Sequence, residues 1–368
     1  MRTLKQKNNR IYEERLPKAA AASFWNNIRA AECGGSSMEV GKIPENVLKR
    51  SVFKQICHRR PEVLVTPGIG RDCAVFAAGE EDAIVMSTDP ITGTASEIGT
   101  LAVHITANDI ASSGAEPIGI MLSVILPKGA KEAELKQMMK DVEAACAQLD
   151  IEVMGGHTEV SRAVNQPIVT VTGVGRIKKD RIMTVSDLKP SQELVMTKWA
   201  GLEGTAILAA DMEEKLRTRY PLDLIESAKG MIEHISVVEE AKIAREHGAV
   251  AMHDITEGGV FGALWEMAAA SDVGLCVDLK KIPLRQETVE ICEFFDLNPY
   301  MLISSGCMLM AADHGNELAE ALQQAGIPAA VIGRVTAGHD RVIINEDERR
   351  FLEPPKTDEL YKAYQERS

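Results

Sequence analysis

The sequence predicts a mixed α/β protein organised in two domains. Its 368 residues are more than a single hydrophobic core usually serves, which indicates two domains. Apolar residues make up 45% of the chain but aromatic residues only 4%, so the core must consist mainly of aliphatic side chains. Short apolar runs alternate with stretches of helical periodicity, and this alternation is typical of helices layered on sheets.

The first half of the chain contains both kinds of element. Residues 98–113 and 131–149 repeat apolar side chains with the period of a helix. Residues 47–58 predict a shorter helix. Strands are predicted by apolar runs at residues 82–89, 119–126, 151–154 and 167–174.

The second half repeats this organisation after a charged stretch at residues 178–190. Its predicted strands are residues 193–197, 250–253, 274–278, 307–311 and 329–335, and its predicted helices are residues 222–247, 259–270, 285–295 and 316–326. The sequence thus predicts an extension at residues 1–37, an N-terminal domain at 38–179, a C-terminal domain at 180–355 and a polar, frayed tail at 356–368.

Composition and charge exclude several classes of protein. The net charge of −13 repels nucleic-acid phosphate, so no nucleic-acid partner is expected. No apolar run approaches the roughly 20 residues that a membrane-spanning helix needs. The seven cysteines form no CxxC pair, which argues against a zinc site or a disulfide framework and favours reduced thiols in the cytoplasm.

Four aspartates at the ends of elements or on a predicted helix form a candidate metal site. They are Asp72 in GIGRDCAV, Asp89 in STDPITG, Asp109 in ANDIA and Asp254 in HDITEGGV. Mg²⁺ prefers oxygen ligands and shares its coordination sphere with substrate phosphates, and a triphosphate needs several carboxylates on rigid elements. We therefore interpret the four as a metal–phosphate site, although a single such aspartate is more often a turn or cap residue.

Five further residues are candidate nucleotide ligands. Asn108 precedes Asp109 and offers an amide to a phosphate or to a metal-bound water. The pair Gly155, Gly156, at a predicted turn after the strand at residues 151–154, and the pair Gly258, Gly259 allow close backbone approach. The second pair also opens a predicted helix, whose free N–H groups favour an anion. Helix packing alone would explain that second pair equally well.

The order of these segments resembles the AIR synthase superfamily. GxG-x-D-x-A-V is followed by TD, by the stretch LAVHITANDIASSGAEP, by GG-x-T and by D-x-T-x-GG. The resemblance is greatest to the hydrogenase-maturation family HypE, from about Gly68 to Pro355, through stretches such as MHDITEGGVFGALWEMAAASDVGL and RRFLEPP. It implies a two-domain PurM-like fold, in which the N-terminal domain forms a dimeric β-barrel-like core and the C-terminal domain is an α/β sandwich.

The resemblance also implies a function. Members of this superfamily bind ATP with Mg²⁺ and phosphorylate or activate an oxygen atom, so we expect ATP and Mg²⁺ as cofactors, a homodimer, and the four aspartates as ligands. His157 and Glu159 are then candidate bases on the acceptor side. A lone histidine is, however, more often a hydrogen-bonded structural residue than a base.

Several positions depart from the HypE pattern. No cysteine follows Cys307, whereas HypE typically ends in a cysteine that carries a carbamoyl group, and Glu159 and Glu257 replace a lysine and an arginine. We therefore predict an ATP-dependent, HypE-like enzyme that phosphorylates or dehydrates an unidentified small-molecule or protein acceptor. Three alternatives stay open: a non-catalytic nucleotide-binding partner in a maturation complex, a small-molecule kinase resembling thiamine-monophosphate kinase, and an inert α/β dimer with vestigial motifs.

Overall fold

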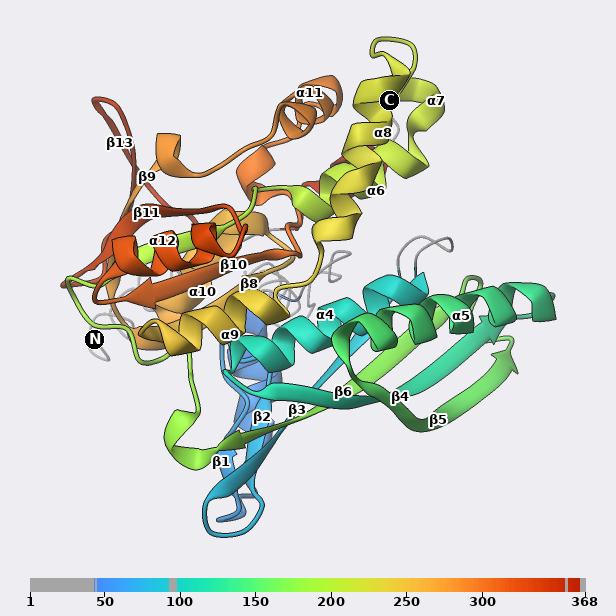
Figure 1. The fold of residues 1–368 in the computed structure, drawn as a ribbon, viewed down its shortest axis with the longest axis horizontal. Coiled ribbons are helices and arrows are strands. Elements are labelled where there is room, and N and C mark those ends of the chain that lie inside the picture. The colour runs from blue at the N-terminus through green and yellow to red at the C-terminus, as the bar shows by residue number, and fades with distance from the viewer. Residues whose placement is uncertain (1–42, 44, 93–97, 355–356, 365–368) are drawn as a thin grey trace, which may run out of the picture. The chain divides into compact units, whose positions relative to one another are not determined.

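The first half of the chain folds into a sheet with two helices on one side. The computed structural model describes residues 43, 45–92, 98–354 and 357–364. Within them the sheet has the strand order β1-β2-β3-β6-β4-β5. Helices α4 (Ile98–Ser112) and α5 (Glu132–Leu149) lie along the same side of it (Figure 1). The strands are β1 (Val63–Val65), β2 (Ala74–Ala77), β3 (Asp82–Ile91), β4 (Glu116–Pro127), β5 (Glu152–Ser161) and β6 (Ile168–Lys178).

The two helices differ in burial because they have different neighbours. Helix α4 is buried along most of its length, since it contacts the sheet, α5 and helix α9 (Val238–Glu246) of the second half. Helix α5 is amphipathic and buries only one stripe, which includes Met138, Val142 and Cys146. It ends at Asp150, whose φ of 56° is the left-handed conformation that often terminates a helix.

Strands β4 and β5 alternate between buried and exposed apolar residues. Ile120 and Leu122 belong to the core, with 1% and 5% of their surface exposed. By contrast, Met121, Met154 and Val160 are between 48% and 62% exposed. The two strands at this edge of the sheet therefore present an apolar patch to the surroundings.

The second half contains a sheet with the order β13-β12-β9-β11-β7-β10-β8. Helix α10 (Gly259–Ser271) packs on β8, β9 and β10, and α12 (Gly315–Gln324) packs on β7, β10 and β11. The strands are β7 (Glu193–Thr197), β8 (Ala249–Ile255), β9 (Gly274–Asp278), β10 (Cys307–Ala312), β11 (Ala329–Thr336), β12 (Arg341–Asn345) and β13 (Glu348–Phe351).

The remaining helices form a separate small core. Leu208, Ile225 and Ile291 are fully buried between them. The helices of this group are α6 (Leu202–Asp211), α7 (Glu213–Leu216), α8 (Leu222–Lys229), α11 (Gln286–Phe295) and the last helix, α13 (Leu360–Tyr364). Short 3-10 turns lie at Lys179–Arg181, Gly230–His234, Leu279–Lys281 and Pro299–Met301.

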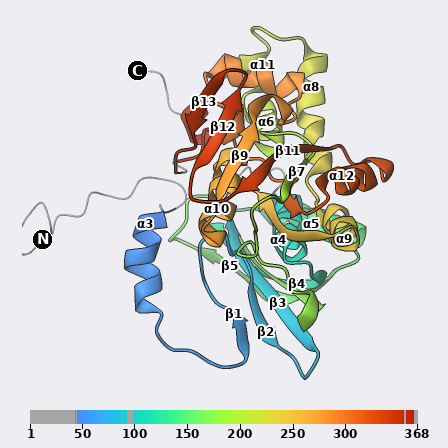
Figure 2. The ribbon, with the colours of Figure 1, turned by 90° about the vertical axis from the view of Figure 1, so that its left-hand side faces the viewer.

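The predicted helix at residues 47–58 is confirmed in part. The chain is helical from α3 (Glu45–Val47) through a π turn (Leu48–Val52) to a 3-10 turn (Phe53–Gln55), and this segment is drawn in blue in Figure 2. The extension predicted at residues 1–37 lies outside the described residues. No described helix combines the length and the apolar character that crossing a membrane requires.

Three sequence-based predictions are corrected by the structure. The helix predicted at residues 222–247 is broken into α8, a 3-10 turn and α9, because the backbone at Ile235 and Val237 bonds to the side chain of Asn108 instead of continuing a helix. The pair Gly155 and Gly156 lies inside β5, not in a turn. The tail predicted to fray instead buries Asp358 to 4% exposure.

Candidate functional site

The four aspartates that the sequence singles out come together in space. They belong to the segment before β2 (Asp72), to β3 (Asp89), to α4 (Asp109) and to β8 (Asp254). Helix α4 contacts both β3 and β8, and this contact brings carboxylates from the two halves to one place. Their role as ligands of a metal or of a nucleotide stays a prediction.

Ser87 links two of these aspartates. Its Oγ lies 2.5 Å from Oδ2 of Asp109 and 3.1 Å from Oδ2 of Asp89. Because β3 side chains alternate between its two faces, Ser87 and Asp89 point to the same side of the strand. The hydroxyl therefore holds the two carboxylates in a fixed orientation beside each other.

The cluster concentrates negative charge in a buried place. Burial is the main cause that raises the pKa of Asp109, and the charges of the neighbouring aspartates raise it further. Burial and the charge of Asp72 likewise raise the pKa of Asp254. Such an arrangement is costly for the protein alone, and a bound cation would remove most of the repulsion.

The buried carboxylate of Asp254 fits the binding of a divalent cation. Asp254 is 2% exposed, and among the described residues neither of its carboxylate oxygens has a hydrogen-bond partner. Buried polar groups are normally satisfied, so two such oxygens on one side chain fit the binding of a cation. Cys73 contributes no thiolate, because burial raises its pKa and its Sγ lies 3.2 Å from the carbonyl of Asp109 as a hydrogen-bond donor.

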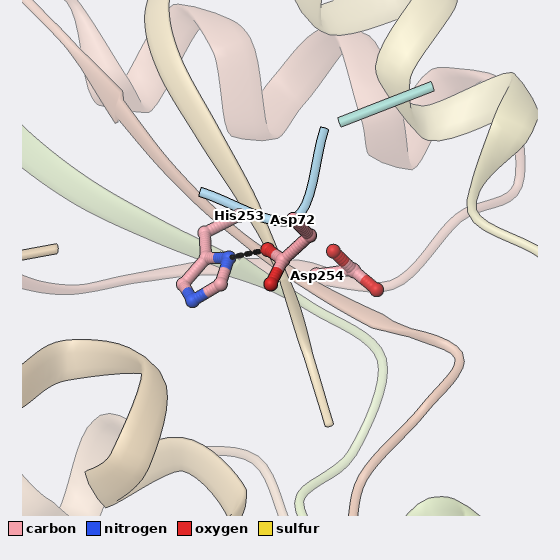
Figure 3. Close-up of side chains that lie close together, drawn as sticks. All are labelled: Asp72, His253 and Asp254. Carbon is pink, nitrogen blue, oxygen red and sulfur yellow. Dashed lines mark ion pairs between the residues drawn. The ribbon is translucent and has the colours of Figure 1, made fainter. Parts of the chain in front are cut away.

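A histidine completes the group. One potential ligand atom from each of Asp72, His253 and Asp254 lies within 4.8 Å of the others, and Figure 3 shows the imidazole facing the Asp72 carboxylate. Nδ1 of His253 is 3.4 Å from Oδ2 of Asp72, and Nε2 is 2.9 Å from Oε2 of Glu266 on α10. Burial lowers the pKa of His253, but the hydrogen bond to Glu266 and the aspartate charges outweigh it and raise the pKa to about 9.

Asn108 has a structural role that the sequence did not predict. Its Nδ2 donates to the carbonyl of Ile235 at 2.8 Å, and its Oδ1 accepts from the N–H of Val237 at 2.8 Å. The side chain is fully buried. Both ends of the amide therefore hold the backbone before α9, and the contact with a phosphate stays a prediction.

The backbone at Gly258 and Gly259 is likewise occupied from within the chain. The N–H of Gly258 donates to Oδ2 of Asp358 at 2.6 Å, and the N–H of Gly259 donates to the carbonyl of Thr256 at 3.0 Å. The anion at the start of α10 is thus a carboxylate of the C-terminal tail. A nucleotide phosphate would have to displace Asp358 to reach the Gly258 N–H.

The predicted bases lie apart from the aspartates within one chain. Asp89 pairs with Val171, Val171 with Leu122, and Leu122 with Gly156. Gly156 therefore sits three strand spacings from Asp89, roughly 14 Å away. His157 follows Gly156 on this edge strand, where its Nε2 lies 3.2 Å from Oε2 of Glu159, and both side chains are exposed.

Comparison with known proteins places the chain in a family. The AIR synthase related protein N-terminal domain matches residues 70–177, and the corresponding C-terminal domain matches residues 189–345. Carbamoyl dehydratase HypE of Rhodobacter capsulatus is 30% identical over 257 residues, which are 68% of this chain and 73% of that protein. The chain belongs to the AIR synthase superfamily and is HypE-like.

Two further relatives of this HypE-like protein support the assignment. A putative hydrogenase expression/formation protein of Methanocaldococcus jannaschii is 28% identical over 335 residues, covering 87% of this chain and 96% of that protein. The crystal structure of HypE in complex with ATP has a TM-score of 0.65 at 19% identity and covers 86% of this chain and 96% of that one. The PurM-like, two-sheet α+β fold expected from the sequence is confirmed. The dimeric barrel needs a second chain and stays a prediction.

One of the four aspartates of this HypE-like protein, Asp72, lines a pocket of about 260 Å³. Phe53 and Trp265 contribute aromatic surface to it, while Asp72, Glu257 and Asp358 contribute carboxylates. A larger pocket of about 720 Å³ is lined by none of the four aspartates and carries several basic residues. Of these two pockets, the smaller one therefore lies next to the candidate site.

No functional role for His253 and Glu266 could be predicted from the sequence. Their separation of 13 residues is not a motif, because the strand β8 and the helix α10 must fold against each other before the two side chains meet. The signal that the sequence offered was His253 directly before Asp254, at the end of a predicted strand. Ser87 was missed for the same reason, since its contact with Asp109 joins two distant segments.

Proposed function

We propose that this HypE-like protein is an ATP-dependent enzyme whose aspartate cluster holds a divalent cation against the nucleotide phosphates. The observation that carries this proposal is the buried Asp254 carboxylate, whose oxygens lack partners although three further aspartates gather around it. The HypE structure solved with ATP shares the fold, which supports a nucleotide as the ligand. Mg²⁺ is the expected ion on the four carboxylates.

Each half of the chain would supply part of this site. Asp89 and Asp109, held by Ser87, come from the domain proposed at residues 38–179, and Asp254 comes from the domain proposed at 180–355. A bound cation would neutralise phosphate charge and polarise the phosphoryl group. The side chains of this protein would position the ion, whose remaining coordination positions would be open to phosphate and water.

The acceptor would bind beside Asp72. The adjoining pocket combines aromatic surface from Phe53 and Trp265 with the carboxylates of Glu257 and Asp358. A substrate that carries a planar or apolar part and hydrogen-bond donors suits this lining. Phosphorylation or dehydration at an oxygen atom of such a substrate, in the cytoplasm, is the reaction that we propose.

A homodimer is part of this proposal. The exposed apolar residues Met121, Met154 and Val160 lie on the two strands at the β5 edge, and a second copy packing there would remove them from water. In such a dimer, His157 and Glu159 of one chain would lie at the interface. Their proposed role as bases therefore depends on the second copy.

The alternative of a non-catalytic partner in a maturation complex is favoured by one observation. Asp358 occupies the N–H of Gly258 at the start of α10, where the sequence predicted a phosphate contact. A protein that keeps this position closed would bind nucleotide without turning it over. Release of several phosphates per chain in the presence of an acceptor would exclude this alternative.

Calorimetric titration with ATP and Mg²⁺ tests the proposed function. The full chain should bind Mg²⁺–ATP with saturation, and Asp254→Asn should weaken that affinity at least tenfold. Asp347→Asn is the matched control, because Asp347 is exposed in the turn between β12 and β13, at the other edge of the sheet from β8. Absence of saturable heat with the wild-type chain would contradict the proposal.

A further inference from the structure

The orientation of His253 is fixed from one side by a carboxylate. Nε2 of the ring lies 2.9 Å from Oε2 of Glu266, and the side chain is 3% exposed. A carboxylate at this distance accepts the Nε2–H, which leaves Nδ1, once a metal ion has displaced its proton, as the ring atom available to a ligand. Metal-binding histidines are commonly held in this way, by a carboxylate on the nitrogen that does not bind the metal.

The other ring nitrogen is buried without a hydrogen bond. In the part of the chain that the structure describes, Nδ1 has no hydrogen-bond partner, and Oδ2 of Asp72 approaches it at 3.4 Å. Figure 3 shows Nδ1 turned toward the Asp72 carboxylate, with the Asp254 carboxylate beyond it. A buried imidazole nitrogen and the two orphaned oxygens of Asp254 therefore lie at the same place.

One ion could contact all three residues. One potential ligand atom from each lies within 4.8 Å of the other two, and ligand atoms on a common metal ion at about 2.1 Å are separated by no more than about 4.2 Å. A small adjustment of Asp72, the one exposed member of the group, would close that difference. The arrangement offers one nitrogen and two carboxylates and leaves further positions for water or phosphate.

We propose that His253 Nδ1, Asp72 and Asp254 bind one divalent first-row transition-metal ion, such as Mn²⁺, with Glu266 as the positioning residue. This inference deepens the proposed function, since it concerns the same aspartate cluster. Mg²⁺ takes oxygen ligands almost exclusively, whereas imidazole nitrogen favours transition metals. The histidine thus makes the site selective for a metal ion that binds both nitrogen and oxygen ligands.

The test is direct binding of Mn²⁺ alone to the full chain, without nucleotide. We expect Mn²⁺ to bind at least tenfold more tightly than Mg²⁺ in calorimetry. Pulsed electron paramagnetic resonance of bound Mn²⁺ should show hyperfine coupling to one imidazole nitrogen. His253→Gln should abolish that coupling, whereas the control His339→Gln, at an exposed histidine, should leave both affinity and coupling unchanged.

A second variant covers the case in which His253→Gln fails to fold. Glu266→Gln keeps the size of the side chain but weakens the hold on the ring, so we expect the Mn²⁺ affinity to fall about tenfold or more while the nitrogen coupling persists. Absence of nitrogen coupling in the wild-type chain, its persistence in a folded His253→Gln chain, or equal affinity for Mg²⁺ and Mn²⁺ would overturn the inference.

Failure of the proposed metal site can be distinguished from failure of the proposed ATP-dependent function. Saturable binding of Mg²⁺–ATP together with no nitrogen coupling to Mn²⁺ would sustain an ATP site and overturn the nitrogen ligand. Nitrogen-coupled Mn²⁺ in a chain that binds no ATP would sustain the metal site and contradict the ATP-dependent enzyme.

Discussion

The side-chain oxygen of Asn108 accepts a 2.8 Å hydrogen bond from the N–H of Val237. The same amide donates to the carbonyl of Ile235 at 2.8 Å, so one side chain of α4 satisfies two backbone groups of the other half. Asn108→Ala would leave both groups buried without partners. Because each such loss costs about 1–3 kcal/mol, we expect the free energy of unfolding in urea to fall by about 2–5 kcal/mol.

Nucleotide affinity separates this structural role from the predicted phosphate contact. We expect the Asn108→Ala chain, at a temperature where it is folded, to bind Mg²⁺–ATP within about threefold of the wild type. A large loss of affinity with unchanged stability would show that the amide reaches the nucleotide after all.

A second prediction concerns the charge of Asp109. Burial raises its pKa, so the folded state holds its proton above the pH at which the unfolded chain loses it. This group therefore costs stability at neutral pH but not at pH 3, where it is protonated in both states. In chelator at pH 7.5, Asp109→Asn should raise the free energy of unfolding, while weakening the binding of divalent ions.

Urea unfolding and metal titration of the same preparation check both parts of this prediction. Asp347→Asn again serves as the control for removal of an exposed carboxylate. A less stable Asp109→Asn chain in chelator would show that hydrogen bonds to the carboxylate, such as that from Ser87, outweigh the repulsion.

Sequence alone predicted the aspartates but not their surroundings. Asp89 and Asp254 were singled out because each stands at the end of an apolar run that predicts a strand, and Asp72 because it follows the glycines of GIGRDCAV. By contrast, the partner of Asn108 is about 130 residues away in the chain, and no local pattern encodes that contact. The same holds for His253 and Glu266, whose contact arises only when α10 packs on β8.

The glycines Gly155 and Gly156 show a second limit of prediction from sequence. The sequence predicted a turn at Gly155 and Gly156, because glycine is frequent in turns. The structure instead places Gly156 in a strand where a Cβ atom would come within 2.0 Å of the carbonyl oxygen of Leu122. Close approach of two backbones and the freedom of a turn select the same residue, so the sequence could not distinguish them.

Gly156→Ala should accordingly destabilise the protein through the pairing of β4 and β5. The added methyl group must push the strands apart, and we expect a loss of about 1–3 kcal/mol in the free energy of unfolding. Gly230→Ala is the matched control, because a Cβ atom there meets no atom within 4 Å. If the β5 edge forms the dimer interface, sedimentation should also show a weaker dimer for Gly156→Ala and an unchanged one for the control.

The free energy of unfolding should depend on pH because Glu203 ionises at a different pH in the folded and in the unfolded state. This residue of α6 is 3% exposed, and burial, with smaller contributions from Asp358 and Glu257, raises its pKa to about 7 from an ordinary value of 4.5. Below pH 4.5 it is protonated in both the folded and the unfolded state. Between that pH and 7 the unfolded chain ionises first, so stability is lost as the pH rises through this window.

Glu203→Gln removes this penalty because the amide does not ionise. The difference in free energy of unfolding between variant and wild type should grow, in favour of the variant, by on the order of 3 kcal/mol from pH 4.5 to pH 8. Urea unfolding of both chains across this range measures it, and other titrating groups cancel in the difference. A difference that is independent of pH would show that Glu203 ionises equally in both states.

We expect the C-terminal segment around Asp358 to stabilise the start of α10. Asp358 accepts hydrogen bonds from the N–H groups of Gly258, Ile303 and Leu360 at 2.6, 3.2 and 2.8 Å. Asp358→Ala leaves the first two donors unpaired, so we expect the stability to fall by about 2–4 kcal/mol and amide exchange at Gly258 and Ile303 to accelerate. Tyr361→Phe, which removes only the hydrogen bond to Glu257, should lower the free energy of unfolding by about 1 kcal/mol.

The Mg²⁺–ATP affinity of the folded Asp358→Ala chain should stay within twofold of the wild type. A marked increase would show instead that the aspartate competes with phosphate for the Gly258 N–H.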